Sequence, residues 1–295
     1  FDIGYGEIEG ESYDSIWRRS EDIIERLYEA QSTASSQHSI ADALAPILKR
    51  LSGDPIVKRG IQWFLASLIE VEYADNYDQL SLKHWDMDEK FRGDDVIVSG
   101  GFHKIVEPMT RELDIRYGHV VDKVSYDGSG VRVTTNQGVI ESERVVVTIP
   151  LGVLQQERVQ FEPPLPEEKI DSIGRLGMGV MNKIALRFSK RFWPEDAYRL
   201  GLLNSSTENL TEYFPITPYS GESVIVGLTR GRHAKSIEMA SKEDVIQHAL
   251  SDLKLMFGSA VPYKPVGSVV TRWHSDEFSH GAYSHVFPGG AFSDY

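Results

Sequence analysis

Residues 120–138, Val-Val-Asp-Lys-Val-Ser-Tyr-Asp-Gly-Ser-Gly-Val-Arg-Val-Thr-Thr-Asn-Gln-Gly, contain the pattern that decides the class of fold. Two β-rich runs, 120–126 and 131–135, flank the turn signal Asp127-Gly128-Ser129-Gly130, and a second turn signal follows at Asn136-Gln137-Gly138. This arrangement predicts an antiparallel hairpin. By the same criteria, further strands are expected at 115–117, 145–149, 180–188, 223–228, 268–273 and 281–287.

Helical patterns fill the chain on the N-terminal side of this stretch. Apolar side chains recur at steps of three and four through residues 13–69. Ser39, with Asp42 three residues later, predicts the N-cap of a helix that Gly53-Asp54-Pro55 ends. Helices are also expected at 103–113 and 242–257. Helices and strands that alternate without an internal repeat predict an α/β (α+β) fold.

Length and composition exclude several classes of protein. The chain has 295 residues, enough for one large domain or two modest ones. It contains no cysteine, which excludes disulfide scaffolds, thiolate metal sites and a cysteine nucleophile. The longest apolar run, 145–154, is too short to cross a bilayer, so no membrane span is expected. The motifs of P-loop, serine-hydrolase and zinc-protease sites are absent from the sequence.

The negative charge is concentrated in the first third of the chain. The whole sequence has a net charge of −13, and residues 1–95 contain 20 acidic and 10 basic side chains. An acidic region repels nucleic acid, so direct nucleic-acid binding is not expected, and it favours cationic partners. The alternative interpretation is an ordinary solvated helical face.

Lys183 is the first candidate for a chemical role. It lies in the middle of the predicted strand 180–188, on the face shared by Met181 and Ala185. A lysine in an apolar setting can act as a base or orient a water molecule. The alternative is a lysine that protects an edge strand from pairing with another chain.

The C-terminal region groups three aromatic residues, Trp273, Phe278 and Tyr283. Aromatic faces attract ammonium groups and stack on flat rings, although ordinary core packing is the alternative. Histidines are also grouped here, but their spacing matches no helix-borne metal pair, so no metal is predicted. Gly4-Tyr5-Gly6 follows no strand and is therefore no dinucleotide fingerprint.

Eight short stretches, in order over most of residues 60–295, resemble the flavin-containing amine oxidase family, which includes polyamine oxidases and lysine-specific histone demethylases. They are Leu80-Ser81-Leu82-Lys83-His84-Trp85-Asp86, Val98-Ser99-Gly100-Gly101-Phe102, Leu113-Asp114-Ile115 with Val120-Val121, Ile149-Pro150-Leu151-Gly152-Val153-Leu154, Phe161-Glu162-Pro163-Pro164-Leu165-Pro166, Asn182-Lys183 with Phe192-Trp193-Pro194, Arg272-Trp273, and Gly281-Ala282-Tyr283-Ser284.

The resemblance implies an FAD-linked amine oxidase fold, in which a Rossmann-like FAD domain is interleaved with a substrate domain of mixed sheet and helices. We expect residues 1–95 to be the helical part of the substrate domain and 96–155 an FAD-domain segment with a β-meander. Residues 156–270 would supply the substrate-domain sheet and helices, and 271–295 the start of a C-terminal FAD segment. The family's first glycine-rich FAD loop and its last FAD segment have no match here. We therefore expect a central fragment that is inactive alone.

The same resemblance assigns roles to individual residues. Lys183 matches the catalytic lysine that binds a water near the flavin. The expected cofactor-binding residues are Val121, Pro150, Trp273 and Phe278. Tyr283 matches one wall of an aromatic cage around the substrate amine, and Glu72 is a candidate amine-binding carboxylate. His285 stands where relatives commonly have an aromatic residue, and we expect it to influence substrate binding.

The implied activity is FAD-dependent oxidation of a small cationic amine, with dioxygen as the acceptor. We expect a polyamine, spermine, spermidine or an acetylated form, to be oxidised to an imine with production of hydrogen peroxide. Alternatives are a lysine-specific histone demethylase-like oxidase, an amino-acid oxidase, and a non-catalytic relative that acts as an interaction module. The glycosylation sequons at Asn204 and Asn209 are weak indications of secretion, and the localisation is not predicted.

Overall fold

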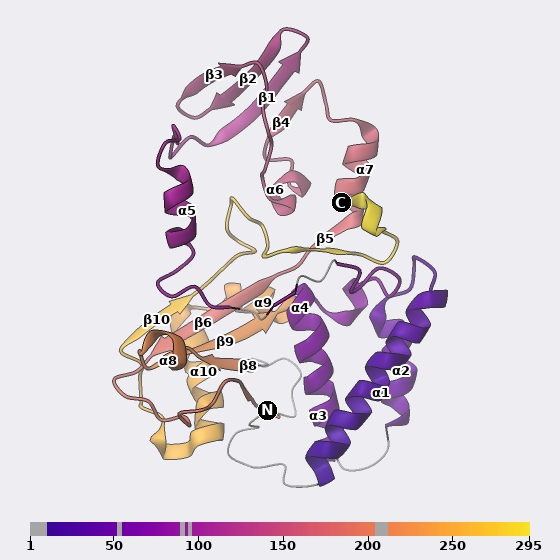
Figure 1. Cartoon of the computed structure of the whole chain (residues 1–295), viewed down its shortest axis with the longest axis vertical. Coiled ribbons are helices and arrows are strands. Elements are labelled where there is room, and N and C mark those ends of the chain that lie inside the picture. The colour runs from indigo at the N-terminus through magenta and orange to yellow at the C-terminus, as the bar shows by residue number, and fades with distance from the viewer. Residues whose placement is uncertain (1–10, 52–54, 89–91, 94–95, 204–211) are drawn as a thin grey trace.

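The helices of the first third form a layer of their own in the computed structural model, which describes all residues except 1–10, 52–54, 89–91, 94–95 and 204–211 (Figure 1). The long helices of the first third lie side by side at one end, and the strands begin at residue 121. The predicted mixture of helices and sheets is confirmed. The sequons at Asn204 and Asn209 lie outside the described residues.

The α-helices are Glu11–Thr33 (α1), Ile40–Arg50 (α2), Pro55–Leu65 (α3), Val71–Tyr73 (α4), His103–Thr110 (α5), Leu151–Gln155 (α6), Glu167–Arg175 (α7), Thr217–Ser220 (α8), Gly231–Glu238 (α9) and Lys242–Phe257 (α10). A π-helical segment, Ala66–Glu70 (η1), continues α3, and a 3-10 turn, Tyr77–Gln79 (η2), follows α4. None of the helices in the described ranges is long and apolar enough to span a bilayer.

The strands are Val121–Asp127 (β1), Gly130–Thr135 (β2), Gly138–Ser142 (β3), Gln160–Glu162 (β4), Leu176–Met178 (β5), Met181–Arg187 (β6), Leu200–Gly201 (β7), Glu212–Pro215 (β8), Val224–Arg230 (β9), Gly267–Val270 (β10) and Ser284–Val286 (β11). They form three sheets, with orders β3-β2-β1-β4, β10-β6-β9-β8-β7 and β11-β5.

The helical layer is held together by apolar side chains that α1, α2 and α3 bury against one another. Leu27, Ile40 and Ile61 are fully buried in this cluster. Ser39 caps α2 as predicted, because its hydroxyl accepts a hydrogen bond from Asp42 N and the Asp42 carboxylate accepts one from Ser39 N. The cap therefore sets where α2 begins.

The four-stranded sheet lies at the far end of the molecule from the helical layer (Figure 1). The predicted hairpin is confirmed: β1 and β2 are antiparallel, and Asp127 pairs with Gly130 at the turn. β4 joins β1 in parallel, with Val124 opposite Phe161. This sheet therefore combines the meander with a strand that follows α6 in the chain.

The five-stranded sheet is packed against α10 and supports the main apolar core. Ile184, Leu186 and Ile225 are each at most 1% exposed and lie in one cluster with Leu250 and Leu253 of α10. Because side chains alternate along a strand, the opposite face of β6 presents Met181, Lys183 and Ala185, as the sequence predicted.

Two of the predicted strands do not form. Residues 115–117 and 145–149 are extended or turn segments without ladder partners among the described residues. Their side chains are largely uncovered: Tyr117 is 83% exposed and Val146 is 85% exposed. A strand requires a neighbour for its backbone hydrogen bonds, and the described part of the chain supplies none at these positions. Apolar composition alone was therefore insufficient.

Candidate functional site

Lys183 projects from the interior of the five-stranded sheet. β6 lies between β10 and β9, so Lys183 does not protect an edge strand. Its side chain is exposed, whereas Asn182 and Ile184 on either side are buried. Lys183 N donates to Thr271 Oγ1 at 2.8 Å, and Lys183 O accepts from Thr271 N at 3.0 Å. The backbone of Lys183 is therefore fixed within the sheet, and its side chain projects from it.

Asn182 connects Lys183 to Trp273, and the sequence analysis assigned it no role. Its side chain is fully buried, and its Oδ1 accepts hydrogen bonds from Thr271 Oγ1 at 3.0 Å and from Trp273 N at 3.1 Å. Its Nδ2 donates to Glu238 Oε1 at 2.7 Å. The backbone of Trp273 is thereby tied to the strand that carries Lys183.

Glu238, at the end of α9, completes this network. Its carboxylate accepts hydrogen bonds from His274 N at 2.9 Å and Ser275 N at 2.8 Å, besides the one from Asn182. Burial opposes its ionisation, but these hydrogen bonds outweigh that effect and lower the pKa of the carboxyl. Glu238 lies 56 residues from Asn182 in the chain, so no local pattern could have revealed the pair.

Tyr283 lies beside the same strand. Its hydroxyl donates to Val71 O at 2.7 Å and lies 3.5 Å from the Met181 sulfur. Burial, together with the nearby charge of Glu72, raises the pKa of the Tyr283 hydroxyl. The structure therefore brings Tyr283 and Glu72 together, as a site for an amine requires, and the hydroxyl is held by α4.

The loop that follows Trp273 and contains Phe278 packs on α6. Gly281 N donates to Trp273 O at 2.8 Å, which closes the loop that contains Phe278. Gly152 of α6 packs on this loop so closely that a Cβ there would lie 2.5 Å from Ser279 O. Pro150, the N-cap residue of α6, is therefore brought to the same region.

Val121 lies apart from this group. It begins β1 and pairs with Thr135 in the four-stranded sheet, at the other end of the molecule from the helical layer (Figure 1). Its expected contact with the adenine end of FAD stays a prediction.

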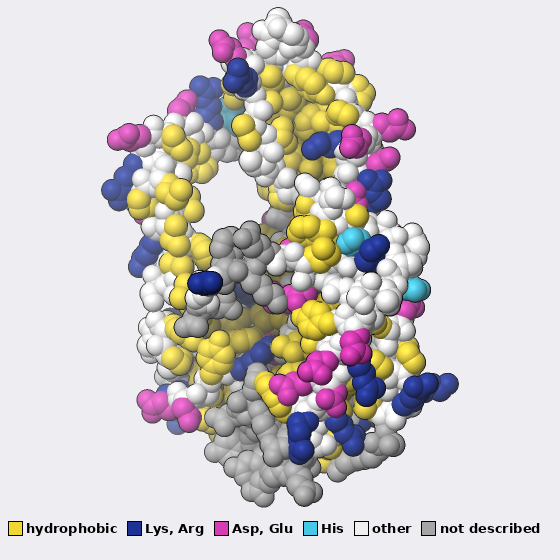
Figure 2. Space-filling view, turned by 45° about the vertical axis from the view of Figure 1, so that its right-hand side comes forward, with side chains coloured by type: hydrophobic (Ala, Val, Ile, Leu, Met, Phe, Trp, Pro, Cys, Tyr) yellow, Lys and Arg dark blue, Asp and Glu magenta, His cyan; other side chains and the backbone are white. Residues whose placement is uncertain are grey.

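Three partly exposed aromatic rings of the segment 273–283 suit a flat aromatic ligand. Trp273, Phe278 and Tyr283 are 41%, 54% and 38% exposed, which does not fit ordinary core packing. Figure 2 shows an opening through the molecule that is bordered by hydrophobic side chains. A flavin ring is flat and aromatic and takes hydrogen bonds at its edge, so Trp273 and Lys183 fit it chemically.

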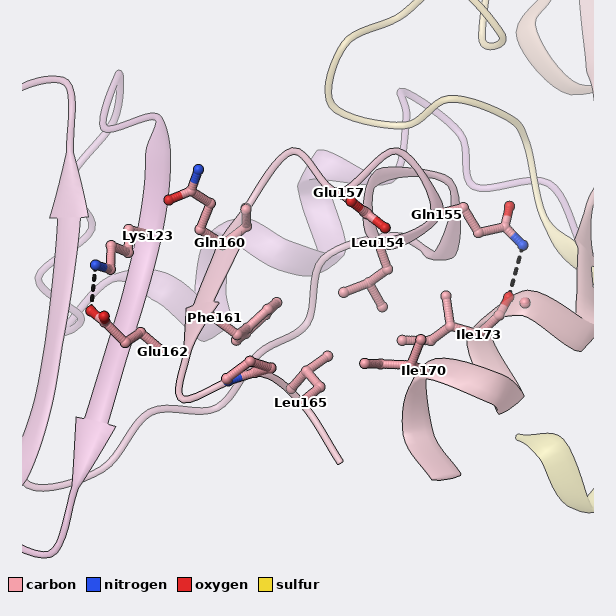
Figure 3. Close-up of a pocket in the computed structure, with 13 residues that line it drawn as sticks. Lys123, Leu154, Gln155, Glu157, Gln160, Phe161, Glu162, Leu165, Ile170 and Ile173 are labelled. Carbon is pink, nitrogen blue, oxygen red and sulfur yellow. Dashed lines mark hydrogen bonds and ion pairs between the residues drawn. The ribbon is translucent and has the colours of Figure 1, made fainter. Parts of the chain in front are cut away.

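A cavity of about 770 Å³ lies away from these residues, between β4, α6 and α7 (Figure 3). Leu154, Phe161 and Ile170 form its apolar wall. At one end Lys123 pairs with Glu162, and this hydrogen-bonded ion pair lowers the pKa of the Glu162 carboxyl. None of the predicted site residues lines it.

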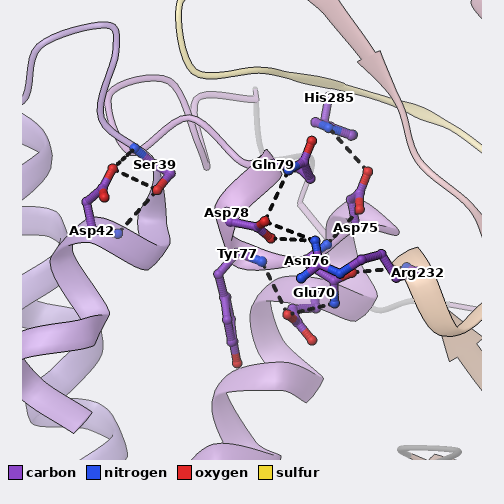
Figure 4. Close-up of polar contacts among 10 residues, drawn as sticks. All are labelled: Ser39, Asp42, Glu70, Asp75, Asn76, Tyr77, Asp78, Gln79, Arg232 and His285. Atoms are coloured by element: carbon purple, nitrogen blue, oxygen red, sulfur yellow. Dashed lines mark hydrogen bonds and ion pairs between the residues drawn. The ribbon is translucent and has the colours of Figure 1, made fainter. Parts of the chain in front are cut away.

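His285 lies behind the site rather than in it. The side chain is 3% exposed, and its Nε2 lies 3.8 Å from Asp75 Oδ2 (Figure 4). Burial, with a smaller contribution from the charge of Lys235, lowers the pKa of His285 to about 4. Gly177 makes room for the ring, since a Cβ there would lie 2.2 Å from Nε2. The expected influence of His285 on substrate binding stays a prediction.

Comparison with known proteins identifies relatives over nearly the whole chain. The family described as flavin containing amine oxidoreductase matches residues 23–295. Lysine-specific histone demethylase 1 homolog 2 of Arabidopsis thaliana is 32% identical over 283 residues, which are 93% of this chain and 38% of that protein. Polyamine oxidase 2 of Arabidopsis thaliana is 31% identical over 293 residues, which are 98% of this chain and 59% of that protein.

A solved structure, putrescine oxidase bound to putrescine, has the same fold. The TM-score is 0.67 at 20% sequence identity, and the match covers 98% of this chain and 67% of that one. Both curated relatives are longer than the part that this chain matches, since it spans 38% of the demethylase homolog and 59% of the polyamine oxidase.

Proposed function

The chain belongs to the flavin-containing amine oxidoreductase family, and we propose that it forms the amine-binding part of an FAD-dependent oxidase that acts on a polyamine. Membership supports an oxidoreductase that uses FAD and an amine substrate. The polyamine, the production of hydrogen peroxide, and the inactivity of residues 1–295 alone belong to the proposal.

One observation supports the proposal most strongly: the C-terminal segment that contains Trp273 and Tyr283 is tied to the strand of Lys183, about 90 residues earlier in the chain. FAD, when bound, would accept the electrons that leave the amine carbon and pass them to dioxygen. The protein would hold the amine, orient water and exclude solvent. Lys183, with its exposed amine on a rigid strand, is suited to hold a water molecule at the reacting end.

Tyr283 and Glu72 would receive the cationic amine. The Tyr283 hydroxyl is occupied by Val71 O, so the part of this residue that a ligand meets is its ring. An aromatic face attracts an ammonium group, and the Glu72 carboxylate adds to that attraction. The acidic excess of residues 1–95 would favour a ligand with several positive charges.

A demethylase-like oxidase is the second candidate, since a demethylase homolog is 35% identical over 259 residues. The segment Leu80–Asp86, one of the eight stretches that resemble the family, has a packing role here. Trp85 is 6% exposed and stacks on Tyr28 with ring centroids 5.0 Å apart, and Gln31 donates to Trp85 O at 2.6 Å. The family resemblance of this segment can therefore be explained by packing as well as by a shared substrate.

The test is anaerobic reduction, by two amines, of the FAD-loaded full-length protein of which this proposal makes the chain a part. We expect spermine to bleach the flavin absorbance at least about tenfold faster than a methyl-lysine peptide at equal concentration, because an acidic cage favours the small polycation. Faster bleaching by the peptide would support the demethylase-like alternative. Intact absorbance with both amines would favour a non-catalytic interaction module.

A further inference from the structure

A second cavity, of about 520 Å³, lies between the helical layer and α9. Its walls come from α2, α3, η1, the segment at η2, the end of β9 and the start of α9. None of the residues assigned above to flavin or amine binding lines it. Its volume is in the range of cavities that hold small organic molecules.

One wall of this cavity is apolar. Leu48, Leu65 and Ala66 line it from the helical layer. Leu65 is fully buried and Ala66 is 8% exposed, so this wall belongs to a packed core rather than to a loose surface. A hydrocarbon group placed against it would be removed from water, at about 25 cal/mol per Å².

The opposite wall is rich in hydrogen-bond donors. Glu70 is its buried carboxylate, 6% exposed, and both of its oxygens are already occupied. Oε1 accepts from Asn76 Nδ2 and Tyr77 N, each at 3.2 Å, and Oε2 accepts from Arg230 Nε at 3.0 Å and Nη2 at 2.7 Å. A guanidinium has five N–H donors, so Arg230 retains donors beyond those two bonds.

Arg232 adds a second cation to this wall. Its Nη1 donates to both oxygens of Asp78, at 3.0 and 2.9 Å, on the side that Figure 4 shows. Asp78 itself does not line the cavity, whereas Arg230 and Arg232 both do. Two guanidinium groups and one saturated carboxylate therefore face the same space.

Two further polar atoms on the walls lack partners. Tyr77 Oη and His233 Nε2 are buried, and neither has a hydrogen-bond partner among the described residues. In Figure 4 the Tyr77 ring points away from the polar cluster, with its hydroxyl beside the helix. Burial, with smaller contributions from His248 and Arg230, lowers the pKa of His233 to about 4, so its ring is neutral at pH 7. Buried polar atoms are nearly always paired, so both call for a ligand or water.

We propose that this cavity binds a small monocarboxylate with an apolar body. The hydrocarbon part would lie against Leu48 and Leu65. The carboxylate would accept hydrogen bonds from Arg230 and His233, while the buried Tyr77 hydroxyl, which Figure 4 shows beside the helix, would donate to it from the side of the helical layer. An ammonium ligand does not fit, because the one carboxylate on the walls is already saturated by four donors.

This site is separate from the proposed amine site and independent of flavin. Arg230 of β9 pairs with Met181 of β6, and Met181 contacts Tyr283 of the proposed amine site. The two sites therefore adjoin at this pair of residues. The two ligands have opposite charges, and the carboxylate would bind whether or not FAD is present. Failure of amine oxidation would therefore leave this inference standing, and failure of carboxylate binding would leave the amine oxidase standing.

The test is calorimetric titration of the full chain with hexanoate, with hexan-1-ol as the uncharged control. We expect hexanoate to bind at least about tenfold more tightly than hexan-1-ol, a difference of about 1.4 kcal/mol. His233→Phe keeps a ring of similar size, removes its hydrogen-bond donor and should weaken hexanoate binding at least about tenfold. Tyr77→Phe keeps the ring, removes the hydroxyl and should weaken it about threefold to tenfold.

A matched control is Tyr263→Phe, which removes the same hydroxyl from a ring that is 82% exposed and does not line the cavity. It should bind hexanoate as the unmodified chain does. Equal affinities for hexanoate and hexan-1-ol would overturn the proposal. So would unchanged hexanoate binding in both Tyr77→Phe and His233→Phe, with folding of each verified by circular dichroism.

Discussion

The five-stranded sheet buries its apolar side chains, whereas the region 96–149 leaves many of its apolar side chains exposed. Around β6 and β9, Ile184, Leu186 and Ile225 are at most 1% exposed and pack on α10. In the other region, Phe102 is 72% exposed and Met109 is 73% exposed, and no residue of α5 is buried. The first region therefore completes its own core, while the second presents an apolar surface.

The difference shows what each region contributes. The five-stranded sheet fixes Lys183, Trp273 and Tyr283 without help from any ligand. The region 96–149 has the composition of buried structure, and large exposed apolar patches mark surfaces that bind something else. We expect flavin or further protein structure to cover the apolar surface of residues 96–149. We make three predictions, and the first two test the difference between the two regions.

The largest expected effect concerns flavin binding. We expect residues 1–295 alone to bind FAD at least about a thousandfold more weakly than a nanomolar flavoprotein, a difference of about 4 kcal/mol. The reason is that no strand followed by a glycine-rich loop and a helix is available, in the described ranges, to hold the pyrophosphate. Fluorescence titration with FAD measures this. Stoichiometric nanomolar binding would contradict it.

The second prediction compares the two regions by mutation. Ile184→Ala should lower the free energy of unfolding by about 3 kcal/mol, because it leaves a cavity in the core against α10. Val146→Ala in the exposed segment should change it by less than about 0.5 kcal/mol. Urea denaturation of both variants checks the pair. Equal losses would mean that Val146 is covered in solution and that the contrast is wrong.

The third prediction concerns two histidines outside both regions, the buried His285 of β11 and the half-buried His233 of α9. The pKa of His285 is lowered to about 4, so between pH 6.5 and 4 the unfolded chain binds more protons than the folded one. The free energy of unfolding should therefore decrease as the pH is lowered through that window. The decrease from His285 alone is up to about 3 kcal/mol, at roughly 1.4 kcal/mol per pKa unit. His233, also lowered to about 4, acts in the same sense.

His285→Phe should accordingly remove about half of the pH dependence that His285 and His233 produce together. Urea denaturation between pH 4 and 7 measures it. Burial raises the pKa of Asp75, which acts in the opposite sense just above pH 3.8. The comparison is therefore best made with Asp75→Asn and with Asp75→Asn combined with His285→Phe. An undiminished slope in the double variant would show that His285 is protonated normally in the folded chain.

Local patterns predicted well where the deciding interactions are local. The cap Ser39–Asp42, the hairpin at Asp127–Gly130 and the face of β6 that holds Lys183 each depend on neighbouring residues. The segments 115–117 and 145–149 have strand composition as well, but their state depends on a partner strand. Sequence composition cannot show whether such a partner is present.

The residues proposed for the site could be identified from sequence motifs, but the buried residues that hold them in place could not. Lys183, Trp273 and Tyr283 were identified from their motifs, and the structure fixes them around β6. The roles of Asn182 and Glu238 come from contacts across 56 or more residues, which no spacing rule reveals. His285 was expected at the substrate, but the missing side chain of Gly177 lets its ring lie in the interior instead.

The central claim is that Lys183 acts on the reaction and not on cofactor binding. The most direct measurement is stopped-flow reduction of the FAD-loaded full-length protein by spermine without oxygen, comparing the unmodified protein with Lys183→Met. We predict that the variant retains bound FAD and is reduced at least about a hundredfold more slowly, as expected when a group that assists proton transfer is lost. Equal reduction rates with FAD bound would remove Lys183 from the mechanism.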